Sequence, residues 1–125
     1  MTHSFPLTVY YEDTDMGGIV YHANFLKFIE RARSTWVAEL GVDQLALAAA
    51  GTVFVVRRIE SDFLAPARLG DVLDVRSSVA EATGVRWLLD QEVWRGQTRL
   101  FSARVTIVAM GPAGRPVRLP AELRR

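Results

Sequence analysis

The chain has 125 residues, of which half are hydrophobic and 23% are charged, the balance of an ordinary globular protein. At this length we expect a single domain, residues 1–125. The formal net charge of +1 predicts no general attraction to nucleic acid or to a membrane surface. With no cysteine present, a thiolate metal site and a cysteine nucleophile are excluded. No signal peptide and no apolar run of about 18 residues is apparent, so we expect a cytoplasmic protein.

A strand, a polar turn and a long helix are predicted for the first third of the chain. Ser4–Tyr11 alternates apolar and polar residues, and Pro6 favours an edge or the start of that strand. A helix is predicted from about His22 to Leu40, and a short second helix over Gln44–Ala50. The apolar residues of the long helix recur every three or four positions and comprise Phe25, Phe28, Ile29, Ala32, Trp36 and Leu40.

From residue 52 onward the hydrophobic period changes to two, which is typical of strands. Four strands are predicted, over Thr52–Phe63, Val72–Ala82, Val85–Trp94 and Thr98–Met110. Short turns join the last three, so we expect antiparallel pairing, with the proline-rich tail along the surface. The order predicts an α+β fold in which an antiparallel sheet wraps around one long helix. One helix cannot cover both faces of the sheet, so we expect a homo-oligomer.

Asp15 is the candidate catalytic residue, because it lies in a turn just before the long helix. The first amides of a helix are unpaired and can hold a carbonyl oxygen that gains negative charge. A nearby carboxylate can attack that carbonyl or take a proton from water. A thioester suits a site with so few catalytic groups, because the leaving thiolate needs little acid assistance. The alternative that Asp13 and Asp15 only bond turn amides stays open.

Other kinds of site fit the sequence poorly. A calcium loop starting at Asp13 has its glycine at the wrong position, and the only histidines for zinc are His3 and His22, so no metal site is predicted. No nucleotide-binding glycine fingerprint and no serine elbow are present. His22 alone is more typical of a structural residue at a helix start. Glu30 with Arg33, or Glu30 with Arg31, are expected to be charges on the helix surface.

The segment from Asp13 to Asn24 has the form D-T-D-x-G-G-x-V-Y-H-x-N, and residues 30–33 follow it as E-R-A-R. In this segment the chain resembles the hotdog-fold thioesterases, and within them the YbgC-like acyl-CoA thioesterases, relatives of 4-hydroxybenzoyl-CoA thioesterase. Further similarity lies in residues 56–58, in residues 66–71, at Gln91 and in the tail from Gly114 to Pro120. The resemblance spans nearly the whole chain.

The resemblance implies a five-stranded antiparallel sheet around a central helix, with active sites at a dimer interface. It implies that Asp15 is the catalytic carboxylate and that the amide at His22 polarises the thioester carbonyl. The substrate-binding residues expected on this basis are Gly18, Val20 and Tyr21 for the acyl group and Arg58, Arg86 and Arg118 for coenzyme A (CoA). Arg86 and Trp87 stand where smaller residues are expected, which leaves the preferred chain length open.

The implied activity is hydrolysis of an acyl-CoA thioester to a free carboxylic acid and CoA, with no cofactor. Asp15 would act as nucleophile or as general base. Two alternatives stay open: hydrolysis of thioesters on an acyl carrier protein (ACP), and a non-catalytic protein that binds acyl-CoA or serves as a scaffold. A dehydratase is disfavoured, because that branch of the fold uses a different motif. The assembly is expected to be a homodimer or a homotetramer.

Overall fold

The computed structural model describes residues 2–124 of the chain. Two α-helices, two short 3-10 helices and six strands follow one another in this part. In chain order they are β1 (Thr2–Thr8), η1 (Tyr11–Asp13), α1 (Asn24–Glu39), α2 (Gln44–Ala49), β2 (Val53–Phe63), β3 (Val72–Ala82), β4 (Arg86–Arg95), β5 (Thr98–Met110), β6 (Pro116–Val117) and η2 (Ala121–Leu123). No helix in residues 2–124 combines the length and the hydropathy that a bilayer crossing requires.

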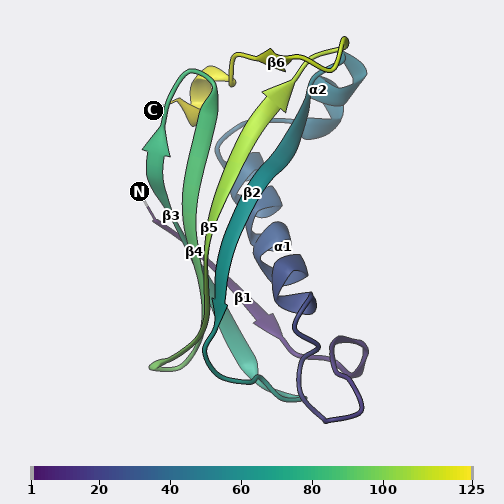
Figure 1. Ribbon diagram of the computed structural model, residues 1–125, viewed down its shortest axis with the longest axis vertical. Helices are drawn as coiled ribbons and strands as arrows, with labels where there is room; N and C mark the ends of the chain where they lie inside the picture. Colours follow the sequence, from purple (N-terminus) through teal and green to yellow (C-terminus); the bar gives the residue numbers. More distant parts are fainter. Residues whose placement is uncertain (1, 125) are drawn as a thin grey trace.

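The strands form one antiparallel sheet in the order β1-β3-β4-β5-β2 (Figure 1). This confirms the predicted α+β fold with five long antiparallel strands, and it confirms that Pro6 lies in an edge strand. The two-residue strand β6 was not predicted. It pairs with β5 at Ala109, one residue beyond the last pairing of β4 with β5 at Val108. The free edges of the long strands are therefore those of β1 and β2.

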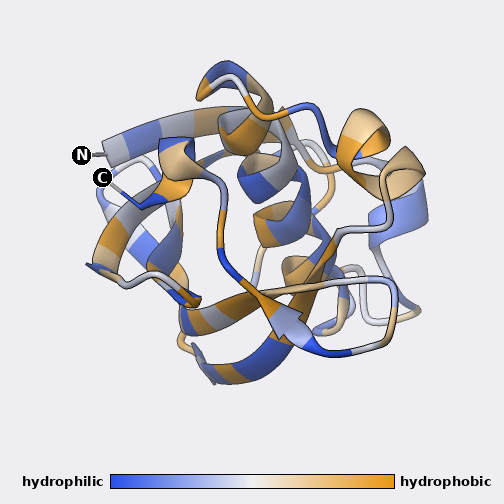
Figure 2. Ribbon diagram, turned by 90° about the horizontal axis from the view of Figure 1, so that it is seen from above, coloured by the Kyte–Doolittle hydropathy of each residue, from blue (hydrophilic) through white to orange (hydrophobic). Residues whose placement is uncertain are grey.

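Helix α1 lies against the inner face of the sheet, which curves around it (Figure 2). Its buried residues confirm the predicted apolar stripe, except that Leu40 is only partly buried. At the start of α1, Phe25 stacks on Phe101 of β5 with 5.1 Å between the ring centroids. Towards its end, Trp36 packs against Trp87 of β4 with 5.5 Å between the centroids. The core therefore holds α1 near both of its ends.

Alternation along the strands separates the buried inner face from a charged outer face. On β4, the side chains of Trp87, Leu89 and Val93 are buried, whereas Val85 precedes the strand and is half exposed. On the outer face, Asp90 of β4 receives two hydrogen bonds from the guanidinium of Arg104 on β5, at 2.9 and 3.0 Å. Cross-strand pairs of this kind suit a solvated face.

Several element boundaries differ from the predictions by one to three residues, and two of these differences flank the Asp15 turn. The first strand ends at Thr8, and Tyr11 instead begins the helix η1, because the carboxylate of Asp13 accepts the Tyr10 N–H and bends the chain. Helix α1 begins at Asn24 rather than His22. The two preceding residues form a turn, in which the Asn24 N–H donates to the carbonyl of Tyr21 at 2.8 Å.

Two further predictions about side-chain location were wrong. Arg33 is buried, with 8% of its surface exposed, rather than at the helix surface. The tail does not simply lie along the surface, because Leu119 and Leu123 are 1% and 2% exposed and extend the core beside β6. The Leu119 N–H also donates to the carbonyl of Gly84 in the turn between β3 and β4, at 2.8 Å. The tail therefore closes one end of the molecule.

The burial of the tail predicts the effect of removing one of its side chains. Leu119→Ala should lower the free energy of unfolding by about 2–4 kcal/mol, because it leaves a cavity in a fully buried site. Leu45→Ala is the control, since Leu45 of α2 is 85% exposed and its loss should change stability by less than about 0.5 kcal/mol. Urea unfolding of both variants measures the difference. Equal stability of the two variants would contradict the packing of the tail.

Candidate active site

The segment that carries Asp15 is a tight turn between two short extended pieces. Thr14 and Val20 form an antiparallel bridge, and the Asp15 N–H donates to the carbonyl of Ile19 at 3.0 Å. The turn closes with a bond from the Gly18 N–H to the carbonyl of Asp15, also 3.0 Å. Gly18 has φ of 75°, a conformation that residues with a Cβ rarely adopt. Gly18 therefore shapes the backbone that presents Asp15.

The Asp15 carboxylate lies exposed at the end of this turn. Its Oδ1 accepts the Gly17 N–H at 2.8 Å, which fixes the direction of the side chain. A Cβ at position 17 would lie 3.1 Å from the same oxygen, so glycine there leaves room for the carboxylate. Within residues 2–124, Oδ2 accepts no hydrogen bond and is open to a ligand or to water.

Asp13, unlike Asp15, is buried and holds neighbouring backbone in place. Its side chain is 5% exposed, and its Oδ2 accepts the Tyr10 N–H at 2.8 Å. Its backbone carbonyl accepts the Tyr21 N–H at 3.0 Å and the Asn24 side-chain amide at 2.9 Å. Asp13 therefore ties the turn to the first residue of α1.

The start of α1 has unpaired N–H groups. Ala23 occupies the N-cap position, where Ser, Thr, Asp or Asn would supply a side-chain oxygen, and no side chain caps the helix. Within the described residues, the amide N–H groups of His22 and Ala23 donate to no protein atom, whereas those of Asn24 and Phe25 bond to carbonyls one turn earlier. Such groups, at the positive end of a helix dipole, can bind an oxygen with negative charge.

Three aromatic rings border this helix start. The imidazole of His22 lies 4.6 Å from the Tyr21 ring and 5.7 Å from the Phe63 ring, between centroids. Phe63, at the end of β2, is 49% exposed and contacts Phe25 and Phe101 from its other side. No local sequence pattern distinguishes Phe63, because only the register of β2 with β5 brings it to the site.

A second loop, residues 64–71, supports the turn from behind. The Val20 N–H donates to the carbonyl of Ala67 at 2.8 Å, and Ile19 forms a bridge with Arg68. Arg95 donates to the carbonyl of Pro66 at 3.1 Å and to the carboxylate of Asp71 at 2.9 Å. The family resemblance in residues 66–71 was the one sequence signal that pointed to this loop.

The Asp71 carboxyl group responds to this pairing. Burial alone would raise the pKa of Asp71, but hydrogen bonds from the Arg68 N–H and from Arg95, with the charges of both arginines, hold that pKa below its usual value. The ionised form of Asp71 therefore holds the supporting loop in place.

The predicted substrate-binding residues divide into two groups in space. Gly18, Val20 and Tyr21 lie in the Asp15 segment, with Val20 buried and Tyr21 half exposed. Arg58, Arg86 and Arg118 do not join them within one chain. Arg58 lies on the free edge strand β2. Arg86 starts β4 and Arg118 follows β6, both at the end of the sheet away from the Asp15 turn (Figure 1).

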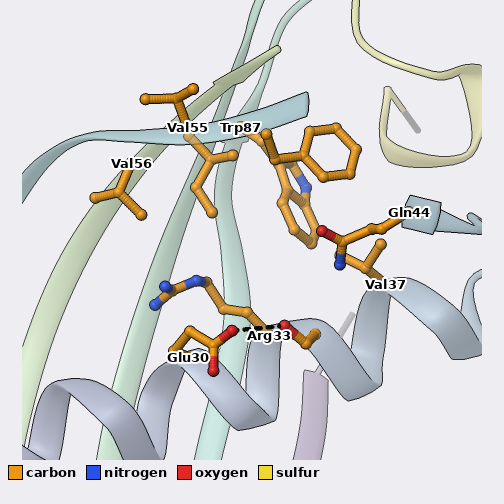
Figure 3. A pocket seen from close by; sticks show the side chains of 10 residues that line it. Glu30, Arg33, Val37, Gln44, Val55, Val56 and Trp87 are labelled. Carbon is orange, nitrogen blue, oxygen red and sulfur yellow. Dashed lines mark hydrogen bonds between the residues drawn. The ribbon is translucent and has the colours of Figure 1, made fainter. Parts of the chain in front are cut away.

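A cavity of about 150 Å³ lies between α1 and the sheet (Figure 3), and none of the residues that line it belongs to the Asp15 turn. It is lined by Glu30, Arg33, Ser34, Val37, Gln44, Phe54, Val55, Val56, Trp87 and Ile107. At its helix side the Ser34 hydroxyl donates to the carboxylate of Glu30 at 3.0 Å.

In residues 2–124, no three side chains of the types His, Asp and Glu gather as a metal site would require.

An antiparallel sheet around one helix is shared with a known group of proteins. The sequence pattern of the thioesterase superfamily matches residues 17–102, more than half of the chain, and the chain belongs to this superfamily. It is 40% identical over 124 residues to the acyl-CoA thioesterase YbgC of Haemophilus influenzae, covering 97% of this chain and 90% of the relative.

Two further relatives agree in sequence and in structure. The acyl-CoA thioester hydrolase YbgC of Escherichia coli O6:H1 is 38% identical over 108 residues, covering 86% of this chain and 81% of the relative. The crystal structure of a probable thioesterase from Bartonella henselae superposes with a TM-score of 0.92 at 35% identity, covering 96% of this chain and all of the other. These likenesses confirm the hotdog fold and the resemblance to the YbgC-like thioesterases.

The lowered pKa of Asp71 predicts a pH-dependent contribution to stability. Because the folded pKa lies below the unfolded value of about 4, the contribution is present above that pH and is lost as the pH falls through the folded pKa. Asp71→Asn should therefore lower the free energy of unfolding at pH 7 by up to about 1 kcal/mol, with the gap fading below about pH 4. Urea unfolding at pH 7, 5 and 3 measures this.

The matched control for Asp71→Asn is Asp62→Asn. Asp62 is exposed on β2, and its side chain makes no hydrogen bond within residues 2–124. This variant should follow the wild type at every pH. A gap between Asp71→Asn and the wild type that stays the same at pH 3 would contradict the role of the Asp71 carboxylate.

Proposed function

We propose that this protein hydrolyses acyl-CoA thioesters to a free carboxylic acid and CoA, with Asp15 as the catalytic carboxylate. The observation that carries the proposal is the pair of unpaired amides at His22 and Ala23, in the same short segment as the exposed carboxylate of Asp15. The acyl-CoA thioesterase activity named for the YbgC relatives supports the choice of substrate class.

The first role is that of the helix start. The thioester carbonyl oxygen accepts hydrogen bonds from the amides of His22 and Ala23, and these bonds strengthen as the oxygen gains negative charge. The positive end of the α1 dipole acts in the same direction. Because the amides belong to the backbone, His22 would contribute through its N–H, while its imidazole packs between Tyr21 and Phe63.

The second role is that of Asp15, by one of two routes. As a general base, its carboxylate takes a proton from water while the water oxygen bonds to the carbonyl carbon and the C–S bond breaks. As a nucleophile, it bonds to the carbonyl carbon itself, expels the thiolate, and forms a mixed anhydride that water then cleaves. Both routes leave the free acid and the thiol of CoA. The Oδ2 atom has no partner within the described residues and suits either route.

The acyl group would lie against the exposed aromatic surface beside the helix start. Tyr21 and Phe63 are 48% and 49% exposed, and Val20 fills the space beneath the turn with 4% exposed. Aromatic faces of this kind bind apolar and aromatic groups alike. The cavity beside Arg33 includes none of these residues, so it is distinct from the proposed acyl pocket.

A second copy of the chain would complete the pocket. The edge strand β2 presents Val53, Val56 and Phe63, which are 42–49% exposed. Two β2 strands that pair antiparallel about a two-fold axis run in opposite directions. The end of one sheet that carries Arg86 and Arg118 would then lie on the same side as the Asp15 turn of the other. In this cytoplasmic homodimer, or in a tetramer of two such pairs, these arginines and Arg58 would bind the CoA phosphates.

The proposal is tested with Asp15→Asn, which preserves the size of the side chain and removes its base. Release of CoA thiol from short, long and aromatic acyl-CoA substrates should fall by about 10²–10⁴ in kcat. Glu12→Gln is the control, since Glu12 is exposed one turn earlier and its carboxylate has no described partner. Full activity of a folded Asp15→Asn variant would refute the assignment.

The same assay separates the two alternatives. Faster release from acyl-ACP than from acyl-CoA would assign the substrate to a carrier protein. Binding of acyl-CoA by calorimetry, with no thiol released from any substrate, would identify a binding protein or scaffold.

The dimer is tested by a charge on its proposed edge. Val56→Lys should shift the protein towards the monomer in sedimentation velocity, because an edge lysine opposes strand pairing. Val72→Lys is the control, since Val72 is 65% exposed on β3, away from the β2 edge, and should leave the assembly unchanged. The monomer should also lose activity. An unchanged sedimentation coefficient for Val56→Lys would place the interface elsewhere.

A further inference from the structure

We infer that Gln91 is a positioning residue for the proposed reaction: it fixes α1 along the sheet and so places the amides of His22 and Ala23. The inference rests on the proposed function. Gln91 lies on β4, and its side chain is fully buried under the middle of α1.

Three hydrogen bonds of the Gln91 amide join three elements of the fold. Its Nε2 donates to the backbone carbonyl of Ile29 in α1 at 3.0 Å and to the hydroxyl of Ser77 in β3 at 2.9 Å. Its Oε1 accepts a hydrogen bond from Nη1 of Arg33 at 3.0 Å. Ser77 and Arg33 are 1% and 8% exposed. Both hydrogens of the amide and its oxygen are thus engaged at the helix–sheet interface.

A gain in stability alone does not explain why Gln91 and Arg33, both polar, are buried at this interface. Burial lowers the pKa of Arg33 by removing water from its guanidinium, although the charge of Glu30 opposes that change. Within residues 2–124, no carboxylate lies within 4.0 Å of the Arg33 nitrogens as an ion-pair partner. Apolar residues of similar volume commonly match or exceed the stability of a buried polar cluster. The cluster is therefore better explained by the geometry it imposes.

The cluster fixes the position of α1 along its own axis, relative to the sheet. Apart from the Gln91 cluster and an exposed hydrogen bond between His3 of β1 and Glu39 at the end of α1, the helix face that meets the sheet is apolar. Apolar contact is non-directional, so it tolerates small shifts along the helix axis. A hydrogen bond is directional and weakens within a few tenths of an ångström. The bond from Gln91 to the Ile29 carbonyl therefore sets where along the sheet the helix rests.

The helix transmits this position to the site. Asn24 lies five residues before Ile29, which is about 7.5 Å along a stiff helix. A shift at Ile29 moves the unpaired amides of His22 and Ala23 by a similar amount relative to Asp15. Asp15 is held by its turn and by the loop at residues 64–71, while Asn24 at the helix start is tied to Asp13. A helix shift would therefore be taken up between Asp13 and Asn24, in the stretch that contains the amides of His22 and Ala23. Misplacement of about 1 Å can lower a rate by about 10².

Three variants test the inference by kinetics and by stability. Gln91→Met removes all three bonds and leaves Arg33 without a partner, so the melting temperature and kcat should both fall. The double variant Arg33→Met with Gln91→Met removes both partners, so it should recover most of the stability. Its kcat should stay about tenfold or more below wild type, with KM changed much less, because the hydrogen bond from Gln91 to the Ile29 carbonyl is still missing.

The matched control is Ser77→Ala, which loses one buried hydrogen bond but keeps the link between Gln91 and Ile29. Its kcat should remain within about twofold of wild type. The inference is overturned if the double variant regains wild-type kcat together with stability, or if Ser77→Ala loses as much kcat as Gln91→Met does.

A readout without turnover separates this inference from the proposed function. In NMR spectra, the amide signals of residues 22–26 should shift in Gln91→Met and in the double variant, and stay in place in Ser77→Ala. Unshifted signals in Gln91→Met would overturn the inference, whatever the activity. A wild-type protein that releases no thiol would instead overturn the proposed function alone.

Discussion

The contact between the apolar face of α1 and the inner face of the sheet is the interaction on which the other features depend. It buries the helix along its length and leaves its first residues at one end of the sheet. The Asp15 turn is then built against that end, through Asp13 to the helix start and through Val20 to the loop at residues 64–71. The site is therefore supported by two loops and by one buried element.

The sequence was sufficient to predict the long elements, and it singled out Asp15 as the candidate catalytic residue. The helix and strand periods differ enough that each long element could be predicted within one to three residues at its ends. Asp15 could be singled out for another reason. Its turn, its glycines and the helix start lie within twelve consecutive residues, so local pattern carries almost all of the information.

What escaped prediction depends on partners far away in the chain. The helical pattern predicts Arg33 to be a surface charge. Its burial could not be foreseen, because its hydrogen-bond acceptor, Gln91, lies 58 residues later on another element. Phe63 reaches the site only through the pairing of β2 with β5. Leu119 is buried because the tail returns over the turn at Gly84. Register and closure of the sheet are set by the whole fold, and no local spacing encodes them.

The uncapped start of α1 has a consequence for the thermodynamics of the protein. A helix that lacks a side-chain N-cap gives up about 1 kcal/mol of stability, and here the missing acceptor has the place proposed for the carbonyl oxygen of a ligand. A bound acyl group would then act as the cap of the helix, so binding and folding are linked. At a ligand concentration of 100 times its Kd, such linkage raises the free energy of unfolding by about 2.7 kcal/mol. The resting protein would be the less stable form, and its substrate would complete its secondary structure.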